Sequence, residues 1–269
     1  MVFRSRTGSA RRAAFVAGFC LISFVPATPI CPTARAHDAD QKSEVEAPLR
    51  RCGLGAAFHG GRRKKLVENL RAQAESSLLL VRGLPVTRDY TRFQQDKTFW
   101  YLTGIESPNA TLVVDVRSGA ETLFLPQRNT AKERWEGELW DSTDAWVKEI
   151  SGFTDVRPSN ELFPVLKEMS AGKVVWISKE PWVALSGCWD RALPHDRSIE
   201  RDPLDGRTSR ESALEENLRE KLHVEVRDCA PILAEMRRIK TGEEIDALRH
   251  AGRIGSLAMI EAIRSSRPG

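Results

Sequence analysis

The sequence predicts an α/β fold in which helices cover a central sheet. Short apolar runs of strand length recur along the chain and are rich in Val, Ile or Leu, which is typical of strands buried on both faces. Amphipathic segments with helical spacing lie between these runs, and this alternation predicts a sheet flanked by helices. The 269 residues are 41% hydrophobic and 29% charged, so the chain can bury a sizeable core in one large domain or two smaller ones.

The first 36 residues have the features of a secretory signal peptide. Four Arg residues precede an apolar run, Ala13 to Val25, and Ala34-Arg35-Ala36 places small residues where a signal peptidase reads them. The run is shorter than the ~20 residues that span a bilayer, which favours cleavage near Ala36 over a membrane anchor. Arg11-Arg12 leaves open a twin-arginine export signal. The expected product is exported, periplasmic or extracellular, without a stable membrane anchor.

Residues 37–61 show no sustained periodicity and are expected to form a flexible lead-in. From Arg62 the pattern predicts a helix, because apolar residues follow at helical spacing: Leu66, Val67 and Leu70. The four-residue basic run that begins at Arg62 invites a nucleic-acid interpretation. Acidic residues follow it and no basic face continues, so a solvated helix start is the favoured explanation.

The central part of the chain supplies the predicted sheet and its helices. The strands are expected at Leu78–Val81, Thr111–Val116, Thr122–Leu125, Val174–Ile177 and Val224–Val226. The helices are expected near Ala131–Trp140, around Ala145, Val147 and Ile150, around Leu162, Val165, Leu166 and Met169, and over Ser209–Lys221.

A boundary is predicted at Pro231, where the pattern changes again. A short amphipathic segment ends near Ile239, and Thr241 and Glu244 then have capping-box spacing, which predicts the start of a long helix. Its apolar stripe continues from Ile245 to Ile263 and requires a surface to pack on. We therefore expect a domain over residues 62–230, followed over 231–269 by a linker and the beginning of a second domain.

The charge and the cysteines exclude several classes of protein. The chain has 41 Lys and Arg against 37 Asp and Glu, but the first 36 residues contain five of the Arg and no acidic residue. The remainder therefore has 36 basic and 37 acidic residues, a formal net charge of −1, so global charge favours neither nucleic acid nor an anionic membrane. Three cysteines follow the signal segment, Cys52, Cys188 and Cys229, and their spacing supports neither a disulfide framework nor a zinc site.

A group of motifs gives the chain a resemblance to a known family. The central motif is Phe99-Trp100-Tyr101-Leu102-Thr103-Gly104-Ile105, an aromatic cluster closed by a Thr-Gly turn, and Pro108 and an apolar strand follow it. With Arg63–Leu70, Trp135-Glu136-Gly137 and Met236–Thr241, it resembles the N-terminal domain of Xaa-Pro aminopeptidases (aminopeptidase P) in the creatinase, prolidase and aminopeptidase P superfamily. The resemblance covers about residues 62 to 269. Gln94 departs from it, since the family often has Arg there.

The resemblance implies a fold and an activity. Such N-terminal domains are ribonuclease H-like, with a mixed central sheet and helices on both sides. The catalytic domain that follows them has a pita-bread fold, in which two Asp, one His and two Glu hold two divalent metals, commonly Mn²⁺. Hard carboxylate ligands suit manganese, and paired ions can generate a hydroxide nucleophile and bind the peptide carbonyl. The resemblance places all five ligands beyond Gly269, so no catalytic residue and no metal ligand is expected in this chain.

Other candidate sites in the chain are weak. His195, Asp196 and nearby acidic residues are the best local group of possible metal ligands, but Pro194, Pro203 and Gly206 predict a loop of solvated carboxylates: Asp190, Asp202 and Asp205. Ser186 lacks the Gly-x-Ser-x-Gly pattern of a nucleophile elbow.

Trp135 is the one candidate for a substrate-pocket or subunit-interface residue. The resemblance implies that an aromatic side chain in this segment reaches a neighbouring subunit's active site. The favoured alternative is that Trp135, Leu139, Trp140 and Trp146 form an ordinary buried helix face.

Two hypotheses of function follow. In the first, the chain is the N-terminal, non-catalytic portion of an exported Xaa-Pro aminopeptidase, which removes an N-terminal residue preceding proline once joined to its metal domain. In the second, it is a stand-alone interaction module that pairs with related peptidase subunits. A prolidase origin and a homo-oligomer also remain open. The apolar stripe after Thr241 favours the first hypothesis, since an independent module would not be expected to leave it unpaired.

Overall fold

The computed structural model describes residues 54–87, 91, 93–136, 140–184 and 187–267. The chain forms two units, Met1–Ala39 and Asp40–Gly269, and all described residues belong to the second. The predicted signal peptide and its cleavage site therefore lie outside the described residues. Within the described residues, no helix combines the length and apolar character needed to cross a membrane.

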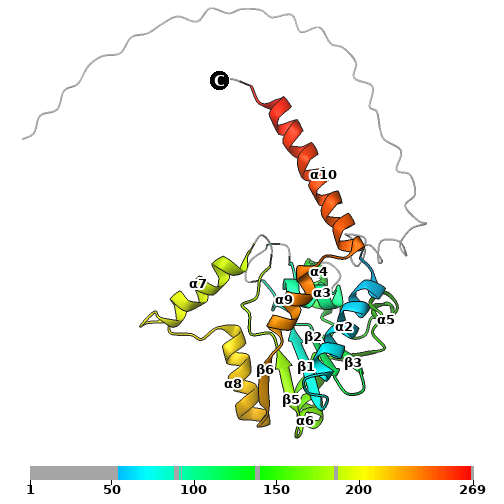
Figure 1. The fold of residues 1–269 in the computed structure, drawn as a ribbon, viewed down its shortest axis with the longest axis vertical. Coiled ribbons are helices and arrows are strands. Elements are labelled where there is room, and N and C mark those ends of the chain that lie inside the picture. The colour runs from blue at the N-terminus through cyan, green and yellow to red at the C-terminus, as the bar shows by residue number, and fades with distance from the viewer. Residues whose placement is uncertain (1–53, 88–90, 92, 137–139, 185–186, 268–269) are drawn as a thin grey trace, which may run out of the picture. The chain divides into compact units, whose positions relative to one another are not determined.

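The core of the fold is a six-stranded mixed sheet with the order β4-β3-β2-β1-β5-β6 (Figure 1). The β1–β2 and β2–β3 pairs are antiparallel, and the other three pairs are parallel. This confirms the expected mixed α/β sheet. The strands are β1 (Ser77–Arg82), β2 (Thr111–Asp115), β3 (Glu121–Leu125), β4 (Asp155–Pro158), β5 (Val174–Ile177) and β6 (Glu225–Asp228).

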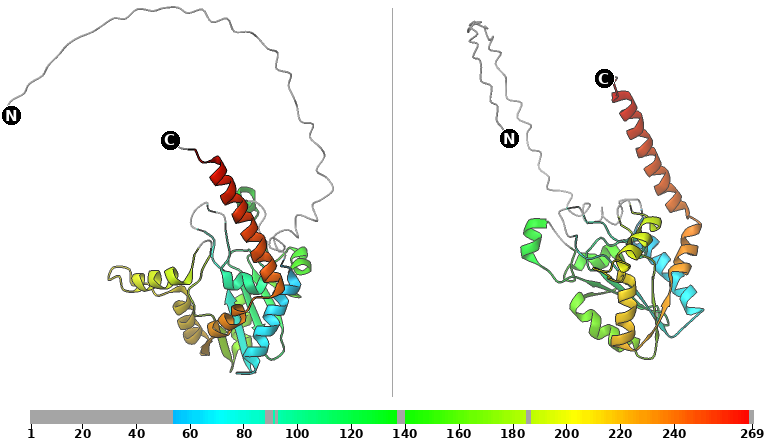
Figure 2. Two further views of the ribbon diagram at one scale, coloured as in Figure 1. Left: turned by 45° about the horizontal axis from the view of Figure 1, so that its top comes forward. Right: turned by 90° about the vertical axis from the view of Figure 1, so that its left-hand side faces the viewer.

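Both faces of the sheet are buried because successive side chains of a strand alternate between them. On β1, Leu79 and Val81 join one apolar cluster, while Leu78 and Leu80 join the other. The first cluster packs under α2 (Ala56–Arg71), α3 (Lys97–Thr103), α5 (Ala145–Ser151) and α9 (Ala230–Arg238). The second packs under α6 (Leu162–Ser170) and α8 (Arg210–Leu222), so helices cover both sides of the sheet (Figure 2).

The aromatic motif forms a short helix, α3, that is closed by a turn at Gly104. Asp96 caps α3, since its carboxylate accepts hydrogen bonds from the backbone N–H groups of Thr98 (3.0 Å) and Phe99 (2.9 Å). Gly104 ends the helix at φ 70°, a left-handed conformation that favours glycine. Phe99 and Leu102 are fully buried, so the motif forms part of the core.

The start of the first helix differs from the sequence prediction. Helix α2 begins at Ala56, so the lead-in expected over residues 37–61 is wrong for its last six residues. The first turns of α2 show no apolar periodicity, because they contain Gly60 and Gly61 and their buried face includes the polar residues His59 and Arg62. Polar contacts, described below, take the place of apolar packing at this end.

The loop expected around His195 is also partly wrong. Residues Trp189–Glu200 form α7, with Pro194 inside it. A proline removes one backbone donor, but a helix can still form around it. No residue of α7 is buried, so the helix gave no core-facing stripe in the sequence. Two shorter elements complete the described fold, α4 (Thr130–Glu136) and the 3₁₀ helix η1 (Ser159–Glu161).

The long helix predicted after Thr241 is confirmed as α10 (Gly242–Ser265). Thr241 Oγ1 accepts from the Glu244 N–H, and the Glu244 carboxylate accepts from the Thr241 N–H (2.8 Å), which completes the expected capping box. No residue of α10 is buried. Its apolar stripe is therefore exposed, with Leu257 57% and Ile263 67% accessible.

Candidate functional site

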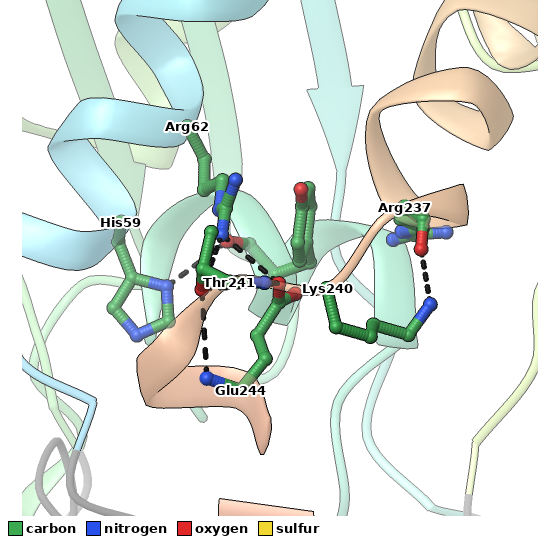
Figure 3. A network of polar contacts seen from close by, with 7 residues as sticks. His59, Arg62, Arg237, Lys240, Thr241 and Glu244 are labelled. Atoms are coloured by element: carbon green, nitrogen blue, oxygen red, sulfur yellow. Dashed lines mark hydrogen bonds and ion pairs between the residues drawn. The ribbon is translucent and has the colours of Figure 1, made fainter. Parts of the chain in front are cut away.

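A cluster of polar and aromatic side chains lies where α2, α3 and α9 meet the first turn of α10 (Figure 3). We call it the α10 junction. It brings together two arginines, a buried histidine and an aromatic ring with the capping box of α10. Its members are His59, Arg62, Tyr101, Arg237, Lys240, Thr241 and Glu244.

Arg62 on α2 is the link between the domain and α10. Its Nη2 donates to Thr241 Oγ1 and to Glu244 Oε2, each at 3.0 Å, while its side chain is only 9% exposed. Charge-assisted hydrogen bonds of this kind are stronger than neutral ones, particularly when water is largely excluded. Because the acceptors are the two capping-box side chains, Arg62 ties the first turn of α10 to α2.

Two guanidinium groups lie close to the ring of Tyr101. Arg237 Cζ is 4.6 Å from the ring centroid and Arg62 Cζ is 5.5 Å from it, and Arg62 also lies 4.6 Å from the ring of Phe58. Aromatic faces attract cations at these separations. The rings thus stabilise two cations that would otherwise repel each other. Burial raises the pKa of Tyr101, so the phenol stays neutral at physiological pH.

Arg237 connects α9 to the start of α3. Its Nη1 donates to Thr98 Oγ1 and its Nη2 to the Lys97 carbonyl, both at 3.3 Å. Burial lowers the pKa of Arg237, although an arginine remains charged at neutral pH. Lys240 in turn donates to the Arg237 carbonyl, which satisfies an acceptor at the C-terminus of α9.

His59 is fully buried beneath the junction. Its Nδ1 lies 3.0 Å from the Tyr101 carbonyl, so Nδ1 carries the proton that is donated to this acceptor. Burial lowers the pKa of His59, and the imidazole is neutral at physiological pH. Nε2 has no hydrogen-bond partner among the described residues. This hydrogen bond joins α2 to α3, so His59 helps to hold the two helices in place relative to each other.

The basic run at the start of the predicted helix is not simply solvated. Arg63 is 2% exposed, donates from Nη1 to the Leu102 carbonyl (2.8 Å) and pairs through Nε with Glu121 (2.8 Å). Its guanidinium lies 4.1 Å from the ring centroid of Phe153. The solvated interpretation is therefore wrong for Arg62 and Arg63, because carbonyl, carboxylate and aromatic partners compensate their burial. Lys64 and Lys65 are exposed.

Trp135 does not belong to a buried helix face. It lies on α4 and is 91% exposed, so the favoured burial interpretation is wrong for this residue. Trp140 packs partly against the core, while Leu139 and the side chain of Trp146 lie outside the described residues. The pocket or interface role of Trp135 remains a prediction.

The other sequence candidates do not assemble into a described site. His195 Nδ1 lies 3.4 Å from Asp196 Oδ1 on the exposed surface of α7. Among the described residues, no group of three or more His, Cys, Asp or Glu side chains could hold a metal ion. Cys188 is exposed, Cys229 is buried, and both are free thiols. Ser186 and Cys52 lie outside the described residues.

Sequence reasoning missed most of the α10 junction. Its capping box was visible as Thr241 and Glu244 three residues apart, but the partner, Arg62, lies 179 residues before Thr241. No periodicity argument joins residues at that separation. The sequence carries no signal that pairs Arg62 with Thr241 and Glu244, because their contact depends on the folded arrangement of α2 and α10.

The chain is similar to a known protein family and to several of its characterised relatives. Residues 59–176 match the family described as aminopeptidase P, N-terminal domain. Xaa-Pro aminopeptidase 3 of Rattus norvegicus is 27% identical over 240 residues, covering 84% of this chain and 41% of that protein. The Xaa-Pro aminopeptidase of Escherichia coli K12 is 28% identical over 218 residues, covering 77% of this chain and 44% of the relative. Xaa-Pro dipeptidase of Mus musculus is 27% identical over 215 residues, covering 77% and 38%.

Solved structures agree with this assignment. Aminopeptidase P from E. coli with the inhibitor Pro-Leu has a TM-score of 0.58 and 25% identity, over 80% of this chain and 46% of that one. The zinc-substituted E. coli enzyme in complex with product has a TM-score of 0.57 and 26% identity, over the same shares. The resemblance inferred from the motifs is confirmed. The chain spans less than half the length of the relatives it matches.

Proposed function

We propose that this chain, in which residues 59–176 form an aminopeptidase P N-terminal domain, is the non-catalytic N-terminal portion of an exported Xaa-Pro aminopeptidase. The complete enzyme would remove an N-terminal residue that precedes proline. In this proposal the described domain positions the catalytic part, and the α10 junction is the connection between them.

The geometry of α10 carries the proposal. Its first turn is held by Arg62 at 3.0 Å from two acceptors, whereas no residue along the helix is buried. An exposed stripe of this size is costly in water and is typical of a surface that packs on another domain. The first turn of α10 is bound to this domain, and we infer that the rest of the helix packs on the next domain.

The metals that the family uses do not fit the described part of the chain. Mn²⁺ prefers several carboxylate or imidazole ligands, and the described residues bring no such group together. We therefore propose that the metal pair, with manganese as the expected ion, is held by residues outside the described part. No catalytic step is assigned to the side chains of the α10 junction.

A direct assay tests the proposal. The purified chain should not release the first residue from an Xaa-Pro peptide in the presence of Mn²⁺. When it is mixed with a separately produced catalytic domain encoded downstream of the Gly269 codon, Mn²⁺-dependent release should appear. Turnover by the chain alone, or the lack of any downstream segment encoding the Asp, Asp, His, Glu and Glu ligands, would contradict the proposal.

Two further parts of the proposal have their own tests. Export predicts a mature N-terminus at His37, which sequencing of the secreted product would check.

The exposure of Trp135 supports a role at a subunit interface or substrate pocket, since Trp is favoured at interfaces. In the assembled enzyme, Trp135→Ala should raise KM or shift the oligomeric state, and Arg134→Ala on the same helix provides a matched exposed control.

The match to a dipeptidase supports a second candidate. Mouse Xaa-Pro dipeptidase is as similar to this chain as the aminopeptidases are. A prolidase would cleave a dipeptide such as Ala-Pro, whereas an aminopeptidase P would also cleave longer peptides. Assays of the assembled enzyme with both substrates distinguish a prolidase from an aminopeptidase P.

A stand-alone interaction module would instead bind related peptidase subunits through α10 without acquiring activity.

A further inference from the structure

A cavity on the face of the sheet opposite the α10 junction has the chemistry of an anion site with an apolar floor. It has a volume of about 260 Å³ and lies between α6, α8 and the end of β1. The apolar wall includes Leu80, Leu162, Phe163, Leu166, Leu214 and Leu218. We call it the α6–α8 cavity.

The charged side chains around the cavity all have the same sign. Arg82, Arg210 and Lys221 line it, and no Asp or Glu is among the described residues that do. Arg210 Nη2 donates to the Gly83 carbonyl at 2.5 Å, which holds the guanidinium at the cavity edge. A charged rim of one sign over an apolar wall is complementary to a ligand that is apolar at one end and anionic at the other.

The two arginines lie close enough to affect each other. Burial lowers the pKa of Arg210, and the charge of Arg82 lowers it further. Burial also lowers the pKa of Arg82, although Glu211 opposes this effect. Glu211 lines a neighbouring cavity, and its Oε2 has no hydrogen-bond partner among the described residues. Glu211 and Asp96 raise the pKa of Arg210, so acidic side chains outside the lining of this cavity offset part of the positive charge. On the cavity side the rim is entirely basic, and an anion bound there would pair with it.

The apolar wall limits the kind of anion. Leu166 and Leu218 are buried, while Phe163 is 50% exposed at the cavity opening. Apolar surface of this kind gains free energy when it is covered by hydrocarbon rather than water. An inorganic anion would leave the wall uncovered, and a neutral hydrocarbon would leave the guanidinium groups unpaired.

We propose that the α6–α8 cavity binds a free monocarboxylate with an aliphatic chain. The carboxylate would accept hydrogen bonds from Arg82 and Arg210, and the chain would lie against the leucines of α6 and α8. Arg guanidinium groups suit this role because their planar fork matches a carboxylate. The inference uses neither the α10 junction nor the proposed peptidase function.

Calorimetric titration of the full chain with octanoate tests the proposal. One octanoate should bind, and Arg82→Gln or Arg210→Gln should each weaken binding by about tenfold, the loss typical of a charge-assisted contact. Arg219→Gln is the matched control, since Arg219 lies on α8 and pairs with Glu215 instead of lining the cavity. It should leave octanoate binding unchanged. Thermal unfolding of each variant verifies that it is folded.

Three outcomes would overturn the proposal. Octylammonium has the same chain with the opposite charge, and equal binding by it would show that the rim does not select anions. An equal loss on Arg219→Gln would show that binding depends only on overall charge. Tighter binding by a peptide with a free C-terminal leucine would assign the cavity to a chain terminus instead of a free acid.

Discussion

Burial raises the pKa of Glu211 to about 7, although the side chain lies in the first turn of α8. In the unfolded chain this carboxyl has the lower, ordinary pKa of a Glu. At a pH between the unfolded and the folded pKa, the folded state therefore binds a proton that the unfolded state does not. The stability that this protonation contributes is fully present below the unfolded pKa. It is lost as the pH rises through about 7.

Glu211→Gln should therefore flatten the pH dependence of the melting temperature. We expect the variant to unfold a few degrees higher than the parent at about pH 8 and to differ little at about pH 5, where Glu211 is mostly protonated. Thermal unfolding across this range provides the measurement. Glu216→Gln on the exposed side of α8 is the control and should leave the pH profile unchanged.

The two described cysteines should differ sharply in reactivity. Cys188 is exposed, whereas Cys229 is fully buried and burial raises its pKa to about 12. The thiolate is the reactive form, so Cys229 should be protected in the folded protein. In a Cys52→Ser background lacking the signal segment, a thiol reagent should modify Cys188 quickly and Cys229 only after unfolding. Equal rates for the two would contradict the burial of Cys229.

At the scale of single elements, the cap of α3 makes a separable contribution to stability. Asp96 accepts hydrogen bonds from Thr98, Phe99 and, through Oδ1, the Val183 N–H at 3.2 Å. Asp96→Ala should lower the free energy of unfolding by about 1–2 kcal/mol, since it leaves these donors unpaired. Denaturant titration would measure the loss.

A conservative change separates the cap from the side chain's other contact. Asp96→Asn retains one carbonyl oxygen and can still cap α3, but it cannot accept on both sides in the same way. It should cost less than the alanine change. Asp190→Ala, in the first turn of the exposed helix α7, serves as control because α7 has no side-chain cap hydrogen bond among the described residues. If that change is equally destabilising, the effect does not come from capping.

The elements that the sequence predicted share a strong local pattern. Strands β1, β2, β3 and β5 are apolar runs, and the cap of α10 has a fixed three-residue spacing. Strand β4 was missed because Asp155-Val-Arg-Pro158 has one aliphatic side chain and only part of its surface is buried. Helix α7 was missed because Pro194 favours a break and no residue of the helix is buried.

The candidate site could be predicted only in part for a related reason. Local spacing gave the Thr241 and Glu244 cap, but burial of Arg62 and His59 depends on contacts across the whole fold. A charged residue in a sequence is ordinarily read as exposed, since an isolated buried charge is costly. Here aromatic rings and carboxylates remove most of that cost, and only the three-dimensional arrangement reveals them.

At the scale of the whole molecule, α10 should be dispensable for folding of the domain before it. No residue of α10 is buried, and its described polar contact to the domain is the one between Arg62 and the capping box. A chain ending at Lys240 should therefore fold, as judged by its circular dichroism spectrum. It should also self-associate less than the full chain, because the apolar stripe has been removed.

Arg62 decides how much stability this truncation costs. Without Thr241 and Glu244, its largely buried guanidinium loses two acceptors, and we expect the melting temperature to fall by a few degrees. Arg62→Met in the truncated chain should restore most of the loss, because a neutral side chain of similar length needs no acceptor. In the full chain the same substitution should be destabilising. Thermal unfolding of the four proteins tests this reversal, and a truncated chain that fails to fold would show that α10 is part of the domain's own core.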